Sequence, residues 1–135
     1  MTFIVQQVAL EAVTAIGPLV PRIARHDKNL AVQIRRAASS LVLNTAEGRG
    51  NDPGTGRARF HTAAGSAREV RAGLELAVVW GFVKRQDVAP IERALDRTNA
   101  LLWGLTSRVI FSSTPRTLAM STHAATSLQL PSAIA

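Results

Sequence analysis

The sequence predicts an all-α protein, an antiparallel up-down-up-down four-helix bundle. Three observations support this. Apolar residues recur every three or four positions along four segments, Gly, Pro, Asn or Asp residues separate the segments, and no stretch alternates apolar and polar residues as a strand would. Short connections favour antiparallel neighbours. We therefore predict one bundle domain over residues 1–111 and a disordered Ser/Thr/Ala-rich tail over residues 112–135.

The first helix is predicted from about Phe3 to Arg25. Gly17-Pro18 and Pro21 interrupt its pattern, because each proline removes an intrahelical hydrogen bond and crowds the carbonyl four residues before it. We expect a kink or a short break near residues 14–17; alternatively, Pro21 is a first-turn residue of a new short segment. The residues expected to face the core are Val5, Ala9, Ala12, Ile16, Leu19 and Ile23.

The second helix is predicted over residues 30–48, with Asp27 as its N-cap. It carries two rows of side chains at helical spacing. The apolar row is Leu30, Ile34, Ala37 and Leu41, and the polar row is Arg36, Ser40, Asn44 and Glu47. The Gly-, Asn-, Asp- and Pro-rich stretch over residues 49–56 is predicted to be a loop.

The third helix is predicted over residues 57–80, ending at Gly81. Gly65 and Gly73 each cost about 1 kcal/mol relative to Ala in a helix. We therefore expect both glycines to mark close contact with another helix.

The fourth helix is predicted over residues 87–111, with a heptad seam. The seam residues are Val88, Ile91, Leu95, Thr98, Leu102, Leu105 and Val109. Leu101, Trp103 and Ile110 widen the apolar surface, so either the monomer buries them or they form a further helix–helix interface. Trp80 and Trp103 are interpreted as core or interface residues rather than as a ligand platform.

A polar cluster is predicted between the second and third helices. Its members are Arg36, Ser40, Asn44, Glu47, Ser66, Arg68 and Glu69. We interpret it as a structural network that fixes helix register, in preference to a catalytic carboxylate pair. If Glu47 is buried, its replacement by Ala is expected to cost about 3–5 kcal/mol.

Composition limits the chemistry available to the chain. It has no Cys, which excludes disulfides and thiolate metal sites, and no Tyr and only two Trp, which argues against an aromatic platform for nucleic acid. The histidines, His26, His61 and His123, are scattered, and no nucleophile-elbow motif is present. We expect no enzyme activity, no metal and no cofactor. No apolar run reaches the about 18 residues of a membrane span, and no secretory leader is recognisable, so we expect a soluble, cytoplasmic protein.

The net charge of +7 is concentrated in the middle of the chain. Between Arg22 and Arg71 there are ten Lys or Arg residues and four Asp or Glu residues, a net +6. This excess predicts RNA or DNA as a partner, bound through phosphate rather than through base edges. A solvated Arg-rich surface, or an adaptor that binds a protein, fits the same charges. The candidate phosphate contacts are Arg22, Arg25, Lys28, Arg35, Arg49, Arg57, Arg59 and Arg71.

Two blocks of sequence resemble a known family. The first is Gln33-Ile34-Arg35-Arg36-Ala37-Ala38-Ser39-Ser40, Asn44 and Ala46-Glu47-Gly48; the second is Phe60, Ala64-Gly65-Ser66, Glu69, Leu74, Ala77 and Gly81-Phe82-Val83. They are similar to the bacterial four-helix bundle proteins encoded in intervening sequences of large-subunit ribosomal RNA, a family that includes the accessory variability determinant of diversity-generating retroelements. The resemblance implies a ring-like homo-pentamer. For retroelement members it implies nucleic-acid binding and association with a reverse transcriptase.

Overall fold

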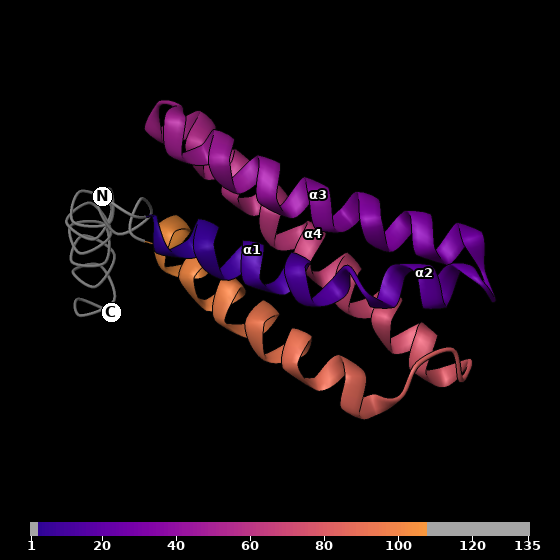
Figure 1. Cartoon of the computed structure of the whole chain (residues 1–135). Coiled ribbons are helices and arrows are strands. Elements are labelled where there is room, and N and C mark those ends of the chain that lie inside the picture. The colour runs from indigo at the N-terminus through magenta and orange to yellow at the C-terminus, as the bar shows by residue number, and fades with distance from the viewer. Residues whose placement is uncertain (1–2, 108–135) are drawn as a thin grey trace, which may run out of the picture.

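The computed structural model describes residues 3–107, and its regular structure is entirely helical (Figure 1). The elements are α1 (Ile4–Ile16), α2 (Leu19–Ala24), α3 (Lys28–Gly50) and α4 (Pro53–Val79), followed by a helix over residues 85–107, called here the 85–107 helix. The predicted all-α class is confirmed for this part of the chain. The predicted end of the fourth helix at Phe111 and the tail over residues 112–135 lie outside the described residues.

The first predicted helix is divided into α1 and α2 at Gly17-Pro18. The backbone N–H of Gly17 donates to the Val13 carbonyl at 3.0 Å, but Pro18 has no N–H to continue the pattern. Pro21 lies in the first turn of α2, where a missing N–H costs little. Both alternatives left open by the sequence are therefore confirmed: the helix has a short break, and Pro21 is a first-turn residue of a new short segment. α2 continues the path of α1 with an offset (Figure 1).

Asp27 caps α3, as predicted. Its side chain accepts a hydrogen bond from the backbone N–H of Leu30 at 2.9 Å, which satisfies one of the free donors in the first turn. α3 continues two residues beyond its predicted end, to Gly50.

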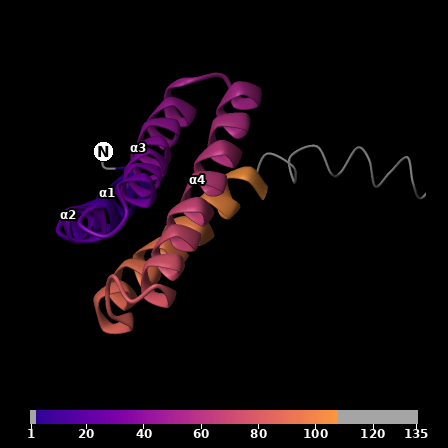
Figure 2. The same ribbon diagram turned by 90° about the vertical axis from the view of Figure 1, so that its right-hand side faces the viewer.

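The loop predicted over residues 49–56 is wrong, because only Asn51 and Asp52 separate α3 from α4. Asp52 is the N-cap of α4 and accepts a hydrogen bond from the backbone N–H of Thr55 at 3.1 Å, while Pro53 occupies the first helical position. A capping Asp followed by Pro starts a helix within a stretch whose composition indicates a loop. The result is a tight hairpin of α3 and α4 (Figure 2).

Glycines set the distance between the two helices of this hairpin. A β-carbon added at Gly56 would lie 2.6 Å from the carbonyl oxygen of Gly48, and one added at Gly73 would lie 2.6 Å from Ile34 Cγ1. These positions therefore have no room for a side chain. The prediction of close contact is confirmed for Gly73 and is wrong for Gly65, where the nearest atom would be 3.8 Å away.

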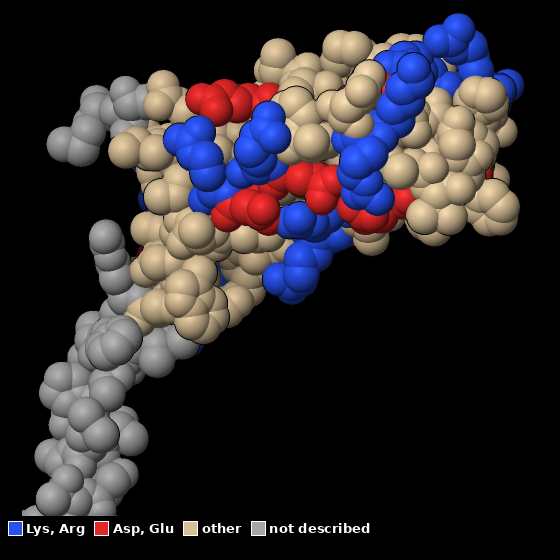
Figure 3. Space-filling view, turned by 90° about the horizontal axis from the view of Figure 1, so that it is seen from below, with Lys and Arg blue, Asp and Glu red and all other residues tan. Residues whose placement is uncertain are grey.

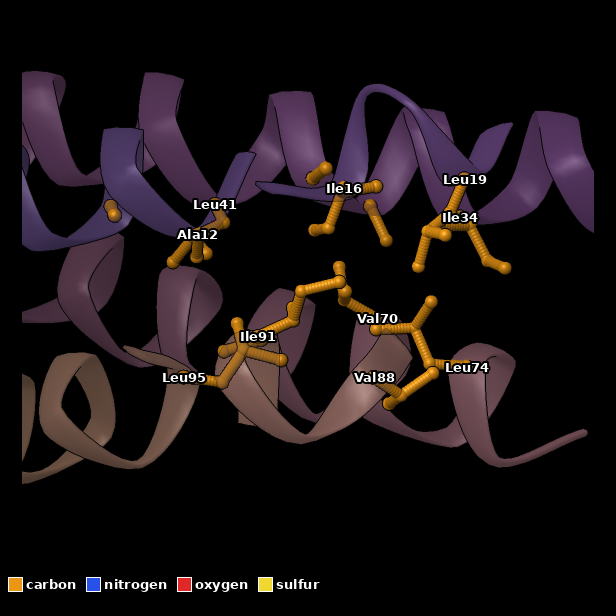
Figure 4. Packing of buried hydrophobic residues seen from close by; sticks show 14 of the residues in the cluster. Ala12, Ile16, Leu19, Ile34, Leu41, Val70, Leu74, Val88, Ile91 and Leu95 are labelled. Atoms are coloured by element: carbon orange, nitrogen blue, oxygen red, sulfur yellow. The ribbon is translucent and has the colours of Figure 1, made fainter. Parts of the chain in front are cut away.

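A single apolar core runs along the bundle and draws side chains from every helix of the described chain (Figure 4). The predicted seam of the 85–107 helix is buried from Val88 to Leu102, Leu105 is half-buried, and Val109 lies outside the described residues. Large core side chains with less than 2% exposure include Ile23, Ile34, Leu41, Val70, Leu74, Ile91 and Leu95.

Neither tryptophan belongs to the core. Trp80 is 66% exposed and Trp103 is 69% exposed, so the part of their predicted role that placed them in the core is wrong. Within residues 3–107, three threonines are buried: Thr45, Thr98 and Thr106. Each satisfies its hydroxyl by donating to a backbone carbonyl three or four residues earlier, at 2.7 to 3.0 Å.

Gly81 ends α4, as predicted, with a φ of 77° that favours glycine. The N–H of Phe82 donates to the Ala77 carbonyl at 2.8 Å, and the N–H of Gly81 donates to the Val78 carbonyl at 2.9 Å. These two bonds form a Schellman motif, which satisfies carbonyls at the helix end. The chain can therefore turn sharply into the 85–107 helix.

Candidate functional site

Ion pairs concentrate where the 85–107 helix meets α1, α2 and α4. Figure 3 shows basic and acidic side chains interleaved on this face of the molecule. The pairs are Arg22–Asp87 (3.1 Å), Arg71–Glu92 (3.1 Å), Arg71–Asp96, Arg85–Glu75 (2.7 Å), Arg85–Glu92 (3.3 Å) and Arg97–Glu11 (3.6 Å). Five of the nine acidic residues of the chain are engaged here.

Three of these pairs involve predicted phosphate contacts, one at Arg22 and two at Arg71. The hydrogen bond to Asp96 raises the pKa of Arg71. The pKa of Asp87 is lowered, first by the backbone N–H of Lys84 and further by Arg22. A lowered pKa means that folding favours the ionised carboxylate. The contribution of Asp87 to stability is therefore present at neutral pH and is lost as the pH falls through its folded-state pKa.

The outer face of α3, in contrast, carries basic side chains without acidic partners in the described part of the chain. No acidic residue occurs between Lys28 and Ala46, whereas Lys28, Arg35 and Arg36 all lie in that stretch. These three side chains are exposed, and none has an acidic partner among residues 3–107. Positive charge is therefore uncompensated along most of α3.

The eight predicted phosphate contacts divide into three groups. Arg22, Arg71 and Arg59 have acidic partners; the partner of Arg59 is Glu47, at 3.0 Å. Arg49 lies over the ring of Phe3, 4.9 Å from its centroid. The rest have no acidic partner within the described residues; they are Arg25, Lys28, Arg35 and Arg57.

Sequence reasoning missed Arg36 and Arg68 as free cations, because it assigned both to the polar cluster. The structure gives neither an acidic partner within residues 3–107. The absence of acids from Lys28 to Ala46 was the available signal for Arg36, and no comparable signal marked Arg68.

A groove of about 620 Å³ runs along the outer face of α3 and is referred to below as the α3 groove. Its volume lies within the range of about 300–1,000 Å³ that is usual for small-ligand sites. The lining residues are Val32, Arg35, Arg36, Ser39, Ser40, Leu43, Asn44, Glu47 and, from α4, Arg59. The predicted polar row of the second helix therefore lines a surface groove.

The predicted polar cluster is smaller in the structure than the sequence suggested. The hydroxyls of Ser40 and Ser66 are 2.8 Å apart, and Asn44 Nδ2 donates to Ser40 Oγ at 3.0 Å and to the Ser40 carbonyl at 2.9 Å. Arg36, Arg68 and Glu69 are exposed and contribute no side-chain hydrogen bond to it among the described residues. Three half-buried residues thus form the cluster, and the Ser40–Ser66 hydrogen bond joins α3 to α4.

Glu47 is not buried in this cluster. The large loss of stability predicted for Glu47→Ala depended on a buried side chain, so that expectation is corrected. Its side chain is 56% exposed and pairs with Arg59, which is 47% exposed. An exposed pair of this kind contributes about 0–1 kcal/mol. We therefore expect Glu47→Ala to change the free energy of unfolding in urea by less than about 1 kcal/mol. A loss of about 3 kcal/mol or more would show instead that Glu47 is desolvated in solution.

Other classes of site have little support in the described chain. Within residues 3–107, no group of three or more His, Cys, Asp or Glu side chains could hold a metal ion. His26 stacks on Phe82 with ring centroids 4.8 Å apart, His61 is exposed, and His123 lies outside the described residues. No helix in the same range combines the length and hydropathy needed to cross a bilayer.

The chain is similar to known proteins over most of its length. Residues 1–104 match the family model described as 23S rRNA-intervening sequence protein. A crystal structure from Bacteroides thetaiotaomicron VPI-5482, of a protein with unknown function from the S23 ribosomal protein family, aligns with a TM-score of 0.66 and 20% identity. The alignment covers 76% of this chain and 97% of that chain, and it shows a shared fold. No curated protein matches significantly.

Proposed function

Because this chain belongs to the 23S rRNA-intervening sequence protein family, as its two sequence blocks predicted, we propose that it is a non-enzymatic protein that binds nucleic acid through phosphate contacts. The observation that supports this most is the uncompensated charge of α3. Lys28, Arg35 and Arg36 have no acidic partner within residues 3–107, although five acids engage arginines on the face of the 85–107 helix. Such a distribution directs a polyanion to one side of the bundle.

Arginine suits this function, since its planar guanidinium donates two parallel hydrogen bonds to a phosphate. Arg35 and Arg36 are adjacent on α3 and both line the α3 groove. Arg25 and Lys28 extend the same charge across the junction between α2 and α3. The contacts would position a nucleic-acid backbone without reading its sequence, so binding should tolerate different sequences.

We expect Arg35→Gln/Arg36→Gln to weaken RNA binding and to make it less dependent on salt. Each phosphate contact to a single strand contributes about 0.7 to the slope of log K against log salt concentration, so losing two should reduce the slope by about 1.4. Fluorescence anisotropy of a labelled 12-nucleotide RNA, titrated at 50 to 200 mM salt, measures this slope. The slope of the unchanged protein provides the reference.

The matched control is Arg85→Gln/Arg97→Gln, which removes the same net charge from the ion-paired face. It should leave the salt slope nearly unchanged, with its folding checked by urea unfolding. An equal reduction in slope would place the phosphate contacts elsewhere on the surface. Absence of binding at low salt, or an affinity that does not depend on salt, would contradict the proposed function itself.

A second candidate function is a structural or adaptor homo-oligomer that binds a protein, and exposed apolar side chains favour it. Val79, Trp80 and Trp103 are 75%, 66% and 69% exposed in the single chain, and a further helix–helix interface would cover them. On the family resemblance, we propose that each chain has the up-down-up-down topology. We also propose that the chains assemble as a ring-like homo-pentamer. The mass of the protein in solution, with and without a short RNA, separates the candidates.

The two candidates can also act together. A ring would repeat the α3 face around the assembly and would multiply modest phosphate contacts through effective concentration. The resemblance to retroelement members extends this proposal to a cytoplasmic ribonucleoprotein that contains a reverse transcriptase.

A further inference from the structure

The α3 groove presents apolar side chains as well as charge. Val32 is 44% exposed and Leu43 is 63% exposed, and both line the groove together with Arg35 and Arg36. Residues 32, 36, 39, 43 and 47 follow one another at steps of three or four, so they form one stripe along α3. A ligand that filled this groove would touch cations and hydrocarbon together.

A duplex is a poor match for this combination. Its accessible outer surface is a row of hydrated phosphates, and pressing Leu43 against them would desolvate charge without supplying a partner. An unpaired strand differs, because its bases can turn away from the backbone and present apolar faces. Guanidinium planes can also stack on those faces, and the groove contains three arginines.

Two further features favour RNA. Ser39 is exposed and lines the groove, and Asn44 uses its Nδ2 to donate to Ser40, which leaves Oδ1 without a hydrogen-bond partner in the described chain. A ribose 2′-hydroxyl both donates and accepts, so it can pair with either group. At one end of the groove, the carboxylate of Glu47 would repel a phosphate but tolerate a base.

We propose that the α3 groove binds an unpaired segment of RNA, with phosphates on Arg35 and Arg36 and bases covering Val32 and Leu43. This inference rests on the proposed function and specifies its ligand. It predicts that the protein prefers a single strand to the duplex of the same sequence. It also predicts that replacing an apolar groove residue by an uncharged polar one lowers affinity for the single strand and leaves affinity for the duplex unchanged.

The test is Leu43→Gln, which keeps the charge of the groove and removes its most exposed hydrocarbon. We expect about a three- to tenfold loss of affinity for a labelled 12-nucleotide RNA without self-complementarity, because the Leu43 side chain covers a base without the aromatic stacking that makes such contacts stronger. Affinity for the same RNA annealed to its complement should be unchanged. Anisotropy titrations of the full chain at low salt measure both.

The matched control is Leu10→Gln, since Leu10 is 46% exposed on α1 and does not line the α3 groove. It should change neither affinity, and an equal loss in this variant would overturn the inference. If strand and duplex bind equally and Leu43→Gln alters neither, the inference fails while salt-dependent binding still supports the proposed function. If neither RNA binds at low salt, both fail. Equal binding of a DNA 12-mer would overturn the choice of RNA.

Discussion

Replacement of Leu41 by Ala is expected to lower the free energy of unfolding by about 2–5 kcal/mol. The Leu41 side chain has 0% exposure and belongs to the core cluster shared by the helices of the described chain. Its removal would lose apolar burial and leave a cavity that the surrounding buried side chains of the core could fill only by moving. Urea unfolding followed by circular dichroism measures the loss.

Leu43→Ala provides the matched control, because it makes the same chemical change two residues along the same helix. Leu43 is 63% exposed and lines the α3 groove, so we expect a change within about 0.5 kcal/mol. Equal losses at positions 41 and 43 would contradict the structure, because they would mean that both faces of α3 are buried. Such a result would also remove the surface on which the proposed RNA site depends.

The sequence was sufficient to predict features that depend on local chemistry. Helical spacing identified the buried row of the 85–107 helix, and capping preferences identified Asp27 and Gly81 at helix ends. These signals act over one or two turns, so they do not depend on where other helices lie. The same reasoning failed at residues 49–56, since composition there indicates a loop although Asp52 and Pro53 start a helix.

The candidate site was only partly predictable, because its character depends on contacts between distant parts of the chain. Arg22 pairs with Asp87, 65 positions away, and Arg71 with Glu92, 21 positions away. No spacing rule indicates that these cations are neutralised while Arg35 is not. The polar row of α3 was identified from spacing, but its position along a groove with Leu43 required the fold.

The second large effect is expected at Gly73, where Ala should destabilise the protein by about 1–3 kcal/mol. The added β-carbon would lie 2.6 Å from Cγ1 of Ile34. Ile34 is 1% exposed, and its branched side chain is held in one rotamer by the helix, so α3 itself would have to move. The higher helix propensity of Ala offsets at most about 1 kcal/mol of this cost. Urea unfolding again measures the change.

Gly65→Ala separates packing from propensity, because Gly65 lies two turns earlier on the same helix and is not tightly packed. Its nearest neighbour would be Arg68 Nη2 at 3.8 Å, the end of a flexible and exposed side chain. Propensity then acts alone, and we expect stabilisation by about 0.5–1 kcal/mol. If Gly65→Ala raises the free energy of unfolding and Gly73→Ala lowers it, the α3–α4 distance is set where Gly73 meets Ile34. If Gly73→Ala also stabilises, the two helices are not held at that distance in solution, and the geometry of the α3 face loses its support.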